Sequence, residues 1–389
     1  MTLQKRTSGA ALLLAALLSL LACGPPSDGG DGGPDRAGTG GGRGGAQEKE
    51  KEASVAVEDM SVGEMVGQMF VVSVGGTEPD YYAEKMVRER NIGGVILFGH
   101  SMKSEEQVRG LTASLQRLSM RTEPAVPLFV AVDQEGGDVA SAPWVAPQPS
   151  AAEVGSRGDP AEARAIAGRI GEELLGAGVN TNFAPVVDTG FGAAIGNRSY
   201  GEDPGLVSRM GAASVEGFEG AGIVSAAKHF PNHGPAVADS HRALPVVEHD
   251  METIRSYDLP PFRAAVEAGV PMVMAGHLLY PAVDAQKPAS LSPGWMGLLR
   301  EDLGFEGVIV TDDLAMAGAS GGGTPERAAV EAVEAGADLL VVSSPPQQQA
   351  DAYDAVVAAV ESGRIPESRL RASVGRLLRI KEDYAFARG

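Results

Sequence analysis

Several residue types are scarce in this sequence, and each scarcity narrows the possible functions. The 389 residues include one cysteine, so the rest of the chain suits an exported protein that avoids unwanted disulfides. Two tryptophans and an aromatic share of 5% leave few stacking surfaces, which favours a short pocket over a long polysaccharide groove. Basic residues number 32 against 51 acidic ones, and the net charge of −19 argues against a nucleic-acid partner.

The remaining composition is that of an ordinary soluble globular protein. Hydrophobic residues make up 43% of the chain and charged residues 21%. A chain of 389 residues can bury a large core, and α/β barrels of about 250 residues or more remain single domains. An acidic surface favours a soluble, monodisperse molecule, so we expect a monomer.

The first residues resemble an export signal. A basic pair precedes the apolar run AALLLAALLSLLA (10–22), which is too short to span a bilayer comfortably, and the run ends at Cys23. The segment LLAC is similar to a bacterial lipoprotein signal, in which the cysteine is acylated and becomes the mature N-terminus. Small Ala22 favours this interpretation; an ordinary signal peptide with an incidental cysteine is the alternative.

A low-complexity segment follows the signal. Residues 24–46 are dominated by glycine, cannot build a core, and are typical of a flexible tether. The sequence therefore predicts a signal peptide at 1–22, a tether at 23–54 and a folded domain at 55–389. We expect an exported protein anchored through Cys23 to the cell envelope, in the outer membrane and periplasm or at the cell surface.

Eight short apolar runs recur along the folded region. They are residues 67–76, 92–99, 127–137, 179–188, 222–230, 270–279, 307–313 and 337–344. Continuous apolar runs of this length are typical of parallel strands that are covered on both faces. Segments with helical spacing lie between them, such as DPAEARAIAGRIGEELLGAG (159–178) and TPERAAVEAVEAGA (324–337). Strands that alternate with helices eight times predict a single (β/α)8 barrel; an open doubly wound sheet is the alternative.

Polar residues close five of the eight runs. They are Asp133, Asp188, Lys228, His229, His277, Asp312 and Asp313. In a barrel the carboxyl ends of the strands form the active face, so these side chains should meet at one mouth. Any single one could merely cap a following helix, but the set together predicts a functional site.

The segment HFPNHGPAVADSH (229–241) holds three of the six histidines of the chain. Its prolines and small turn residues do not give the HExxH-like spacing of a zinc-binding helix, and no second ligand cluster stands out. We therefore expect no metal and no cofactor, and keep a metal-dependent barrel hydrolase as an alternative.

Proton transfer explains this loop better. Asp239 and His241 are two residues apart, so in an extended loop their side chains project to the same side. A carboxylate beside an imidazole fixes its tautomer and favours the protonated ring, which can act as a general acid. Asp312 ends the seventh run, and a carboxylate nucleophile facing a proton donor is the arrangement of retaining glycoside hydrolysis.

Five sequence blocks carry a resemblance to a known family. They are VDQEGG (132–137), NRSYGEDP (197–204), KHFPNHGPAVADSHRALPVV (228–247), PASLSP (288–293) and GFEGVIVTDDLAMAGA (304–319). Together they are similar to glycoside hydrolase family 3, and within it to the bacterial β-N-acetylhexosaminidase branch, which the DSH triplet separates from the β-glucosidases. The resemblance covers residues 60 to 385 and implies a (β/α)8 barrel without a second domain.

The resemblance also implies roles for individual residues. Asp312 matches the nucleophile that forms a covalent glycosyl-enzyme, and His241 matches the general acid/base, with Asp239 as its partner. Four further residues match those that hydrogen-bond the terminal sugar. They are Asp133, Arg198, Lys228 and His229. The implied activity is that of an exo-β-N-acetylglucosaminidase acting on peptidoglycan fragments or chitooligosaccharides.

Four positions qualify this expectation. Asp138 and Ser141 stand where the family commonly has arginines, which leaves sugar preference open between β-N-acetylglucosaminides and other β-glycosides. The same loss of cations motivates a third hypothesis, a surface lipoprotein that binds glycans without cleaving them. Asn232 replaces a usual glycine, which could restrict the motion of the histidine loop, although asparagine tolerates left-handed backbone well. Trp144 either forms one side of the pocket or packs against the protein.

Overall fold

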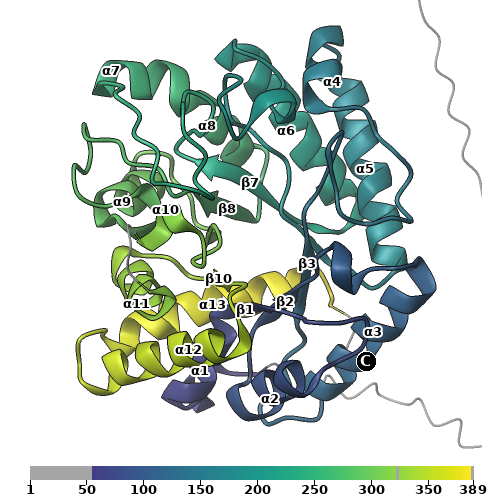
Figure 1. Cartoon of the computed structure of the whole chain (residues 1–389), viewed down its shortest axis with the longest axis vertical. Coiled ribbons are helices and arrows are strands. Elements are labelled where there is room, and N and C mark those ends of the chain that lie inside the picture. Colours follow the sequence, from purple (N-terminus) through teal and green to yellow (C-terminus); the bar gives the residue numbers. More distant parts are fainter. Residues whose placement is uncertain (1–54, 321–323, 387–389) are drawn as a thin grey trace, which may run out of the picture. The chain divides into compact units, whose positions relative to one another are not determined.

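The computed structural model describes residues 55–320 and 324–386. The predicted signal peptide, the acylation site at Cys23 and the whole of the predicted tether lie outside these residues. At the centre of the described region stands one sheet of parallel strands, surrounded by helices (Figure 1). Its members are β1 (Phe70–Ser73), β2 (Gly94–Ile96), β3 (Phe129–Val132), β6 (Thr181–Asn182), β7 (Val224–Phe230), β8 (Met272–Ala275), β9 (Val308–Thr311) and β10 (Leu340–Val342).

The sheet closes into a barrel. Hydrogen-bonded neighbours run in the order β10-β1-β2-β3-β6-β7-β8-β9, and every pairing is parallel. The two ends meet where the Thr311 N–H donates to the Leu339 carbonyl (2.9 Å) and the Leu339 N–H donates to the Ile309 carbonyl (3.1 Å). The predicted (β/α)8 barrel is confirmed, and the alternative of an open sheet is wrong.

All eight predicted runs contain a barrel strand, and every run extends beyond its strand. The fourth run keeps only Thr181 and Asn182 in its strand, because Pro185 has no N–H to donate and pairing resumes only as a single bridge at Val186. The third run ends in a separate antiparallel hairpin, formed by β4 (Gln134–Gly136) and β5 (Val139–Ala140). This hairpin lies at the mouth of the barrel.

Helices cover the outside of the barrel. They are α1 (Val62–Gln68), α2 (Tyr81–Arg90), α3 (Glu105–Ser119), α4 (Ala151–Arg157), α5 (Pro160–Gly176), α6 (Pro204–Ala221), α7 (Met251–Thr253), α8 (Pro260–Glu267), α9 (Pro293–Glu301), α10 (Ala317–Ser320), α11 (Pro325–Ala335), α12 (Pro346–Glu361) and α13 (Glu367–Asp383). Within the described part of the chain, none of them is both long and apolar enough to cross a bilayer.

Local sequence explains where these helices begin. The side chains of Asp159 and Asp203 accept backbone hydrogen bonds at the starts of α5 and α6, and a proline occupies the first helical position of each. Gly222 ends α6 at φ +81°, in the left-handed region that glycine adopts without strain. The two segments predicted as helices form α5 and α11.

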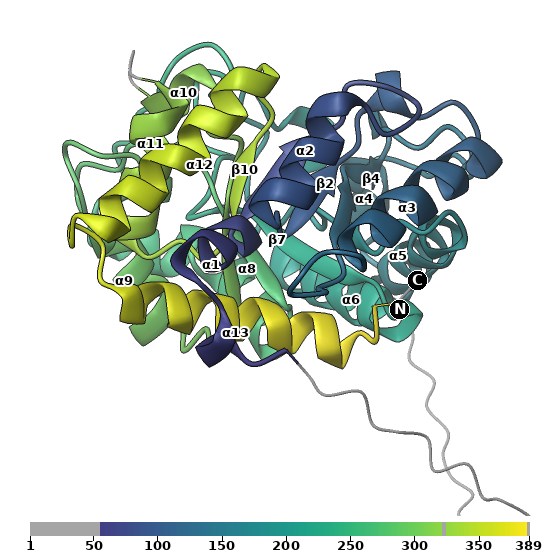
Figure 2. The ribbon, with the colours of Figure 1, turned by 90° about the horizontal axis from the view of Figure 1, so that it is seen from below.

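The last helix closes the amino-terminal end of the barrel (Figure 2). Helix α13 carries Lys381, whose Nζ donates to Gln68 Oε1 and to the Gly93 carbonyl, each at 2.9 Å. The same ammonium lies 4.6 Å from the ring centre of Phe129 at the start of β3. Since Lys381 is buried without a carboxylate among these partners, desolvation holds its pKa well below the usual range.

Candidate active site

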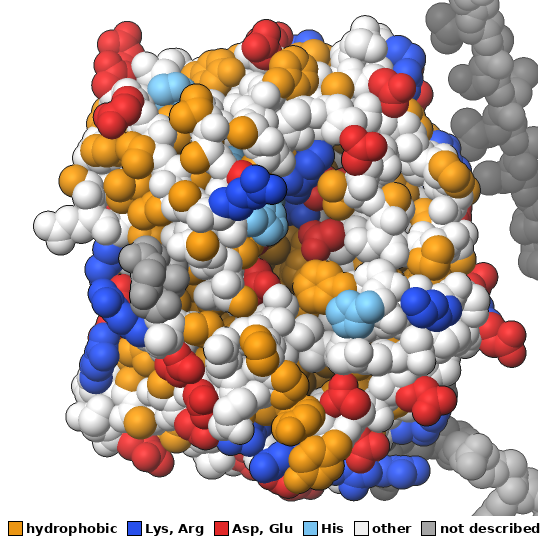
Figure 3. All heavy atoms as spheres, in the orientation of Figure 1, with side chains coloured by type: hydrophobic (Ala, Val, Ile, Leu, Met, Phe, Trp, Pro, Cys, Tyr) orange, Lys and Arg blue, Asp and Glu red, His pale blue; other side chains and the backbone are white. Residues whose placement is uncertain are grey.

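A cavity of about 470 Å³ opens at the carboxyl ends of the strands. In Figure 3 the hollow at the centre of this face gathers basic, acidic and histidine side chains. Six of the predicted site residues line the cavity. They are Asp133, Arg198, Lys228, His229, His241 and Asp312. Asp239, the seventh, contacts the cavity-lining His241. The structure therefore brings together residues that are up to 179 positions apart in the chain.

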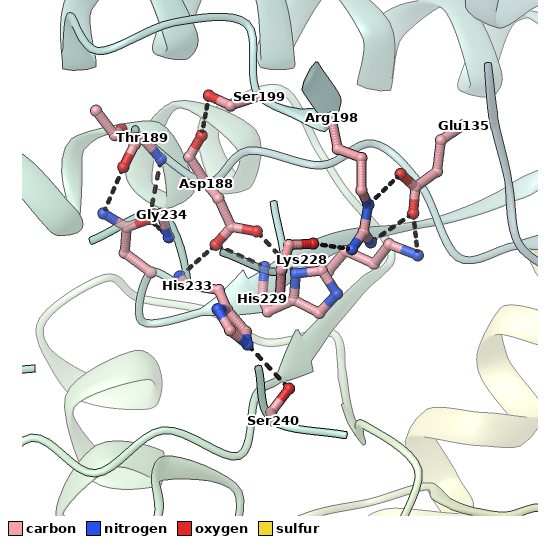
Figure 4. Close-up of polar contacts among 12 residues, drawn as sticks. Glu135, Asp188, Thr189, Arg198, Ser199, Lys228, His229, His233, Gly234 and Ser240 are labelled. Carbon is pink, nitrogen blue, oxygen red and sulfur yellow. Dashed lines mark hydrogen bonds and ion pairs between the residues drawn. The ribbon is translucent and has the colours of Figure 1, made fainter. Parts of the chain in front are cut away.

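A charged cluster forms one wall of the cavity. Lys228 Nζ lies 2.5 Å from Asp133 Oδ1 and 2.7 Å from Glu135 Oε1. Glu135 also receives two parallel hydrogen bonds from Arg198, each 2.8 Å long (Figure 4). Two cations thus share two carboxylates, and the bidentate pair fixes the plane of the guanidinium.

Burial makes this cluster strongly coupled. Desolvation raises the pKa of Glu135, but the charges of Lys228 and Arg198 outweigh it and hold the pKa at about 2. Desolvation likewise lowers the pKa of Lys228, and Asp133 and Glu135 reverse the effect and raise it. Glu135 and Lys228 are therefore ionised at neutral pH, and the wall offers fixed charges and donors to the hydroxyl groups of a polar ligand.

Asp188 lies behind the neighbouring wall of the cavity and holds two histidine residues in place. It is completely buried, and its carboxylate accepts from His229 Nδ1 (2.7 Å), from the His229 N–H (3.2 Å) and from the His233 N–H (2.6 Å). Desolvation raises the pKa of Asp188, but His229 and His233 lower it further than burial raises it. Because Asp188 accepts from Nδ1, it leaves the Nε2 atom of His229 free for a ligand in the cavity.

Asp312 lies at the end of β9 on the cavity surface. Its Oδ1 accepts from the N–H of Asp313 at 2.8 Å, and its own N–H donates to the Ala275 carbonyl of β8 at 2.9 Å. Burial raises the pKa of this carboxyl, but His277, His229 and the Asp313 N–H together bring it below the ordinary value. Asp312 is therefore an ionised carboxylate at neutral pH, as a nucleophile requires.

The neighbouring polar residues hold the turn that carries Asp312. Asp313 accepts from the N–H of Ser343 (3.0 Å) and from its hydroxyl, so it ties the ends of β9 and β10 together. His277 is fully buried; its Nε2 donates to the carbonyl of Asp313 (2.9 Å) and its Nδ1 contacts the Ser290 hydroxyl (2.7 Å). These residues support the turn that carries the carboxylate, and Asp313 and Ser343 also line the cavity.

The loop between β7 and α7 carries the second predicted pair. His241 Nδ1 lies 2.8 Å from Asp239 Oδ1, and the same oxygen accepts the His241 backbone N–H at 3.0 Å. Burial opposes ionisation of Asp239, but the hydrogen bonds from His241 lower its pKa below the usual value. The side chain of His241 is 67% exposed and reaches the cavity from its solvent side, so the pair can exchange protons with a bound molecule and with water.

The positions that depart from the family pattern have definite places. Ser141 lines the cavity, whereas exposed Asp138 accepts from Asn197 Nδ2 at 2.8 Å. Trp144 packs outside the cavity and donates through Nε1 to the Glu173 carbonyl (3.2 Å). The backbone of Asn232 is not left-handed, because among the described residues only Asn91 and Ala385 combine a side chain with positive φ.

Asn232 instead cross-links the loop through its side chain. Its Oδ1 accepts from the N–H groups of Thr189 (2.9 Å) and Gly234 (3.0 Å), and its Nδ2 donates to Asp258 Oδ1 (2.8 Å). Asp258 also pairs with His249 at 2.8 Å, so His249, which had no assigned role, is part of this network. Asn232 therefore fixes the base of the loop.

One residue of the site, Glu135, was missed from the sequence. It follows Asp133 by two positions, which places both on one side of an extended segment, and this spacing could have revealed it. Asp188 was expected at the mouth of the barrel, but its contacts with His229 and His233 depend on the fold and had no signal in the sequence. Within residues 55–320 and 324–386, no group of three or more histidine, cysteine or acidic side chains is arranged to hold a metal ion.

Comparisons with known proteins agree with this geometry. Residues 61–380 match the family described as "Glycosyl hydrolase family 3 N terminal domain". Beta-hexosaminidase A of Pseudoalteromonas piscicida is 37% identical over 325 residues, which cover 76% of this chain and 54% of that protein. Beta-hexosaminidase of Stenotrophomonas maltophilia (strain K279a) is 34% identical over 318 residues, covering 79% of this chain and 91% of that protein.

Solved structures give the same result. A glycoside hydrolase family 3 β-N-acetylglucosaminidase from Paenibacillus sp. str. FPU-7 superposes with a TM-score of 0.82 at 42% identity, covering 84% of this chain and 63% of that one. The chain thus spans about half the length of the Pseudoalteromonas relative and under two thirds of the Paenibacillus one. The prediction of a glycoside hydrolase is confirmed, and the chain belongs to glycosyl hydrolase family 3.

Proposed function

We propose that this protein is a retaining exo-β-N-acetylglucosaminidase that removes terminal β-linked N-acetylglucosamine from peptidoglycan fragments or chitooligosaccharides. One observation carries the proposal: Asp312 and His241, which are 71 positions apart in the sequence, line the same cavity. The relatives named above as β-hexosaminidases and β-N-acetylglucosaminidases support the choice of sugar.

The proposed reaction has two steps. In the first, ionised Asp312 attacks the anomeric carbon and forms a glycosyl ester while the bond to the leaving oxygen breaks. His241 gives its proton to that oxygen, and Asp239 stabilises the ring in both protonation states. In the second, His241 takes a proton from water, the water oxygen attacks the anomeric carbon, and Asp312 is released. Atoms and charge balance, and no cofactor takes part.

The charged wall supplies recognition of the terminal sugar. Asp133, Lys228 and Arg198 present fixed acceptors and donors, and His229 Nε2 adds a further partner. Hydroxyl groups both donate and accept, so a wall with both kinds of group suits a sugar. A cavity of about 470 Å³ suits removal of a terminal residue rather than cleavage within a long chain.

Replacing Asp312 with Ala tests the mechanism. The variant should release no aryl group from an aryl β-N-acetylglucosaminide, whereas Asp302→Ala, at an exposed position beyond α9, should keep wild-type turnover. Added azide should restore aryl release to Asp312→Ala and yield a glycosyl azide of α configuration, since azide would replace the carboxylate. Undiminished turnover by the variant would refute the assignment.

Ser141 motivates the second candidate, a family 3 enzyme that prefers another β-glycoside, because the cavity has a neutral side chain there. Rates on aryl β-glucoside, β-xyloside and β-N-acetylglucosaminide separate the two candidates. Glycan binding without turnover on any of the three would instead support a non-catalytic glycan-binding protein.

We also propose that the protein is exported and anchored to a membrane of the cell envelope through acylated Cys23. The basic and apolar segment before this cysteine and the glycine-rich segment after it support the proposal. Multiple acyl chains on one cysteine would hold the protein stably at the membrane. The variant Cys23→Ser should leave the membrane fraction on cell fractionation; firm retention would contradict the anchor.

A further inference from the structure

Ser240 lies in the sequence between the two residues of the proposed acid/base pair. Ser240 is buried, whereas its two neighbours are at least partly exposed to solvent. Its exposed fraction is 1%, whereas the side chains of Asp239 and His241 are 35% and 67% exposed. A loop whose central residue is buried is held to the barrel by that residue. The contacts of Ser240 therefore decide where the proposed acid/base lies.

Two hydrogen bonds hold Ser240. Its hydroxyl lies 2.9 Å from His233 Nε2, and its carbonyl accepts the N–H of Gly318 at 2.9 Å (Figure 4 draws the first). Gly318 lies on the short helix α10, which follows Asp312. A Cβ atom at Gly318 would lie 2.8 Å from the Ser240 carbonyl oxygen, so only glycine permits this close approach without a shift. The loop is thus joined both to the histidine segment and to the segment that follows the proposed nucleophile.

His233 is a rigid anchor for this contact. It is 2% exposed, and its backbone N–H donates to buried Asp188 at 2.6 Å. Among the described residues, Nδ1 of His233 has no hydrogen-bond partner. The imidazole ring is therefore held through Nε2, by its hydrogen bond with Ser240. Burial, reinforced by the charge of His229, lowers the pKa of His233, which leaves a neutral ring at neutral pH. Such a ring has one nitrogen that can accept the hydroxyl proton of Ser240.

We propose that Ser240 and His233 form a latch that positions the Asp239–His241 pair over Asp312; this inference rests on the proposed function. Ser240 is a positioning residue, since it acts through its two neighbours in the chain. Asp188 bonds both His229, which is proposed to bind the sugar, and His233 of the latch. One buried carboxylate therefore positions a sugar-binding residue directly and the proposed proton donor through the latch.

The latch predicts a dependence on the leaving group. Replacing Ser240 with Ala removes the hydroxyl and frees the loop, so protonation of the departing oxygen becomes inefficient. For N,N′-diacetylchitobiose, whose leaving group needs that proton, kcat/KM should fall about tenfold, the typical effect of one lost hydrogen bond. For the 2,4-dinitrophenyl β-N-acetylglucosaminide, whose leaving group departs without a proton, kcat/KM should stay within about twofold.

Matched variants separate positioning from damage to the fold. Ser225→Ala removes another fully buried serine hydroxyl, one that has no hydrogen-bond partner in the described part of the chain, and should leave the cleavage of both substrates unaffected. His233→Gln, whose amide can reach the position of Nε2, should retain more chitobiose activity than His233→Leu. If Ser240→Ala does not fold, the contrast between these two His233 variants on the two substrates still tests the latch.

The activities on the two substrates test both the latch and the proposed function. A selective loss on chitobiose supports the latch. An equal loss on both substrates, or no loss on either, overturns it while the proposed function stands. Wild-type protein that cleaves neither substrate would overturn the proposed function itself.

Discussion

Glu135 gives the sharpest test of the electrostatic account, because one carboxylate holds two cations. Its side chain is 7% exposed and lies within 2.8 Å of both Arg198 and Lys228. The change Glu135→Gln keeps the size of the side chain and removes its charge. Arg198 would then lose the carboxylate that it bonds, and Lys228 would keep its contact with Asp133. Loss of one partner from a buried ion pair commonly costs about 3–5 kcal/mol.

The pKa of Glu135 gives an independent magnitude. It lies at about 2 against an ordinary 4.5, a difference of about 2.5 pH units, which at about 1.4 kcal/mol per unit is about 3 kcal/mol. Because the pKa is lower in the folded state, this stability is complete above pH 4.5 and is lost as the pH falls towards 2. The Gln variant lacks it at every pH. The variant should therefore be about 3 kcal/mol less stable than wild type at pH 7 and only about 1 kcal/mol less stable at pH 3.

Urea unfolding of both proteins at the two pH values measures the difference. Asp138→Asn is the control, since this exposed carboxylate three residues away accepts from Asn197 and should change the free energy of unfolding by less than about 0.5 kcal/mol. A Glu135→Gln effect below about 1 kcal/mol at pH 7, or one of equal size at both pH values, would refute the reasoning.

Two further substitutions test other parts of the barrel. Asn232→Gly removes hydrogen bonds to Thr189 and Asp258 and adds backbone freedom. The free energy of unfolding in urea should therefore be about 3 kcal/mol lower than that of wild type. An unchanged free energy of unfolding would show that the cross-link does not stabilise the loop. Lys381→Met removes a buried amine whose pKa is lowered, and the unfolded chain binds its proton below about pH 10.4. The variant should therefore gain stability relative to wild type as the pH falls from 10 to 8, by up to about 1.4 kcal/mol per pH unit, and a difference that does not vary with pH would contradict this.

The sequence predicted the barrel because periodicity and strand ends are local properties. Eight apolar runs, helix-starting aspartates and polar residues at the run ends all point to one architecture, and the cavity lies where those ends meet. The catalytic roles of Asp312, His241 and Asp239 stay a prediction, although the structure places these residues at the cavity.

Other features depend on three-dimensional closure and could not be read from a local pattern. The side-chain bonds of Asn232 reach Thr189 and Asp258, which are 43 and 26 positions away. Glu135 was missed for a different reason. In the same motif, only Asp133 was predicted to bind the sugar. The latch at Ser240 likewise needs a histidine seven residues earlier whose backbone is fixed by Asp188.

Helix α13 closes one end of the barrel, so the two ends of the domain differ. Arg371 of this helix donates to the carbonyl of Val57 (3.1 Å), so the first described residues join the barrel at its closed end, and the cavity opens at the other. A purification tag, bead or other support attached ahead of residue 55 therefore connects on the side away from the mouth. Immobilised in this way, the enzyme would present its opening to the surrounding medium, and large glycan fragments could approach without passing the point of attachment.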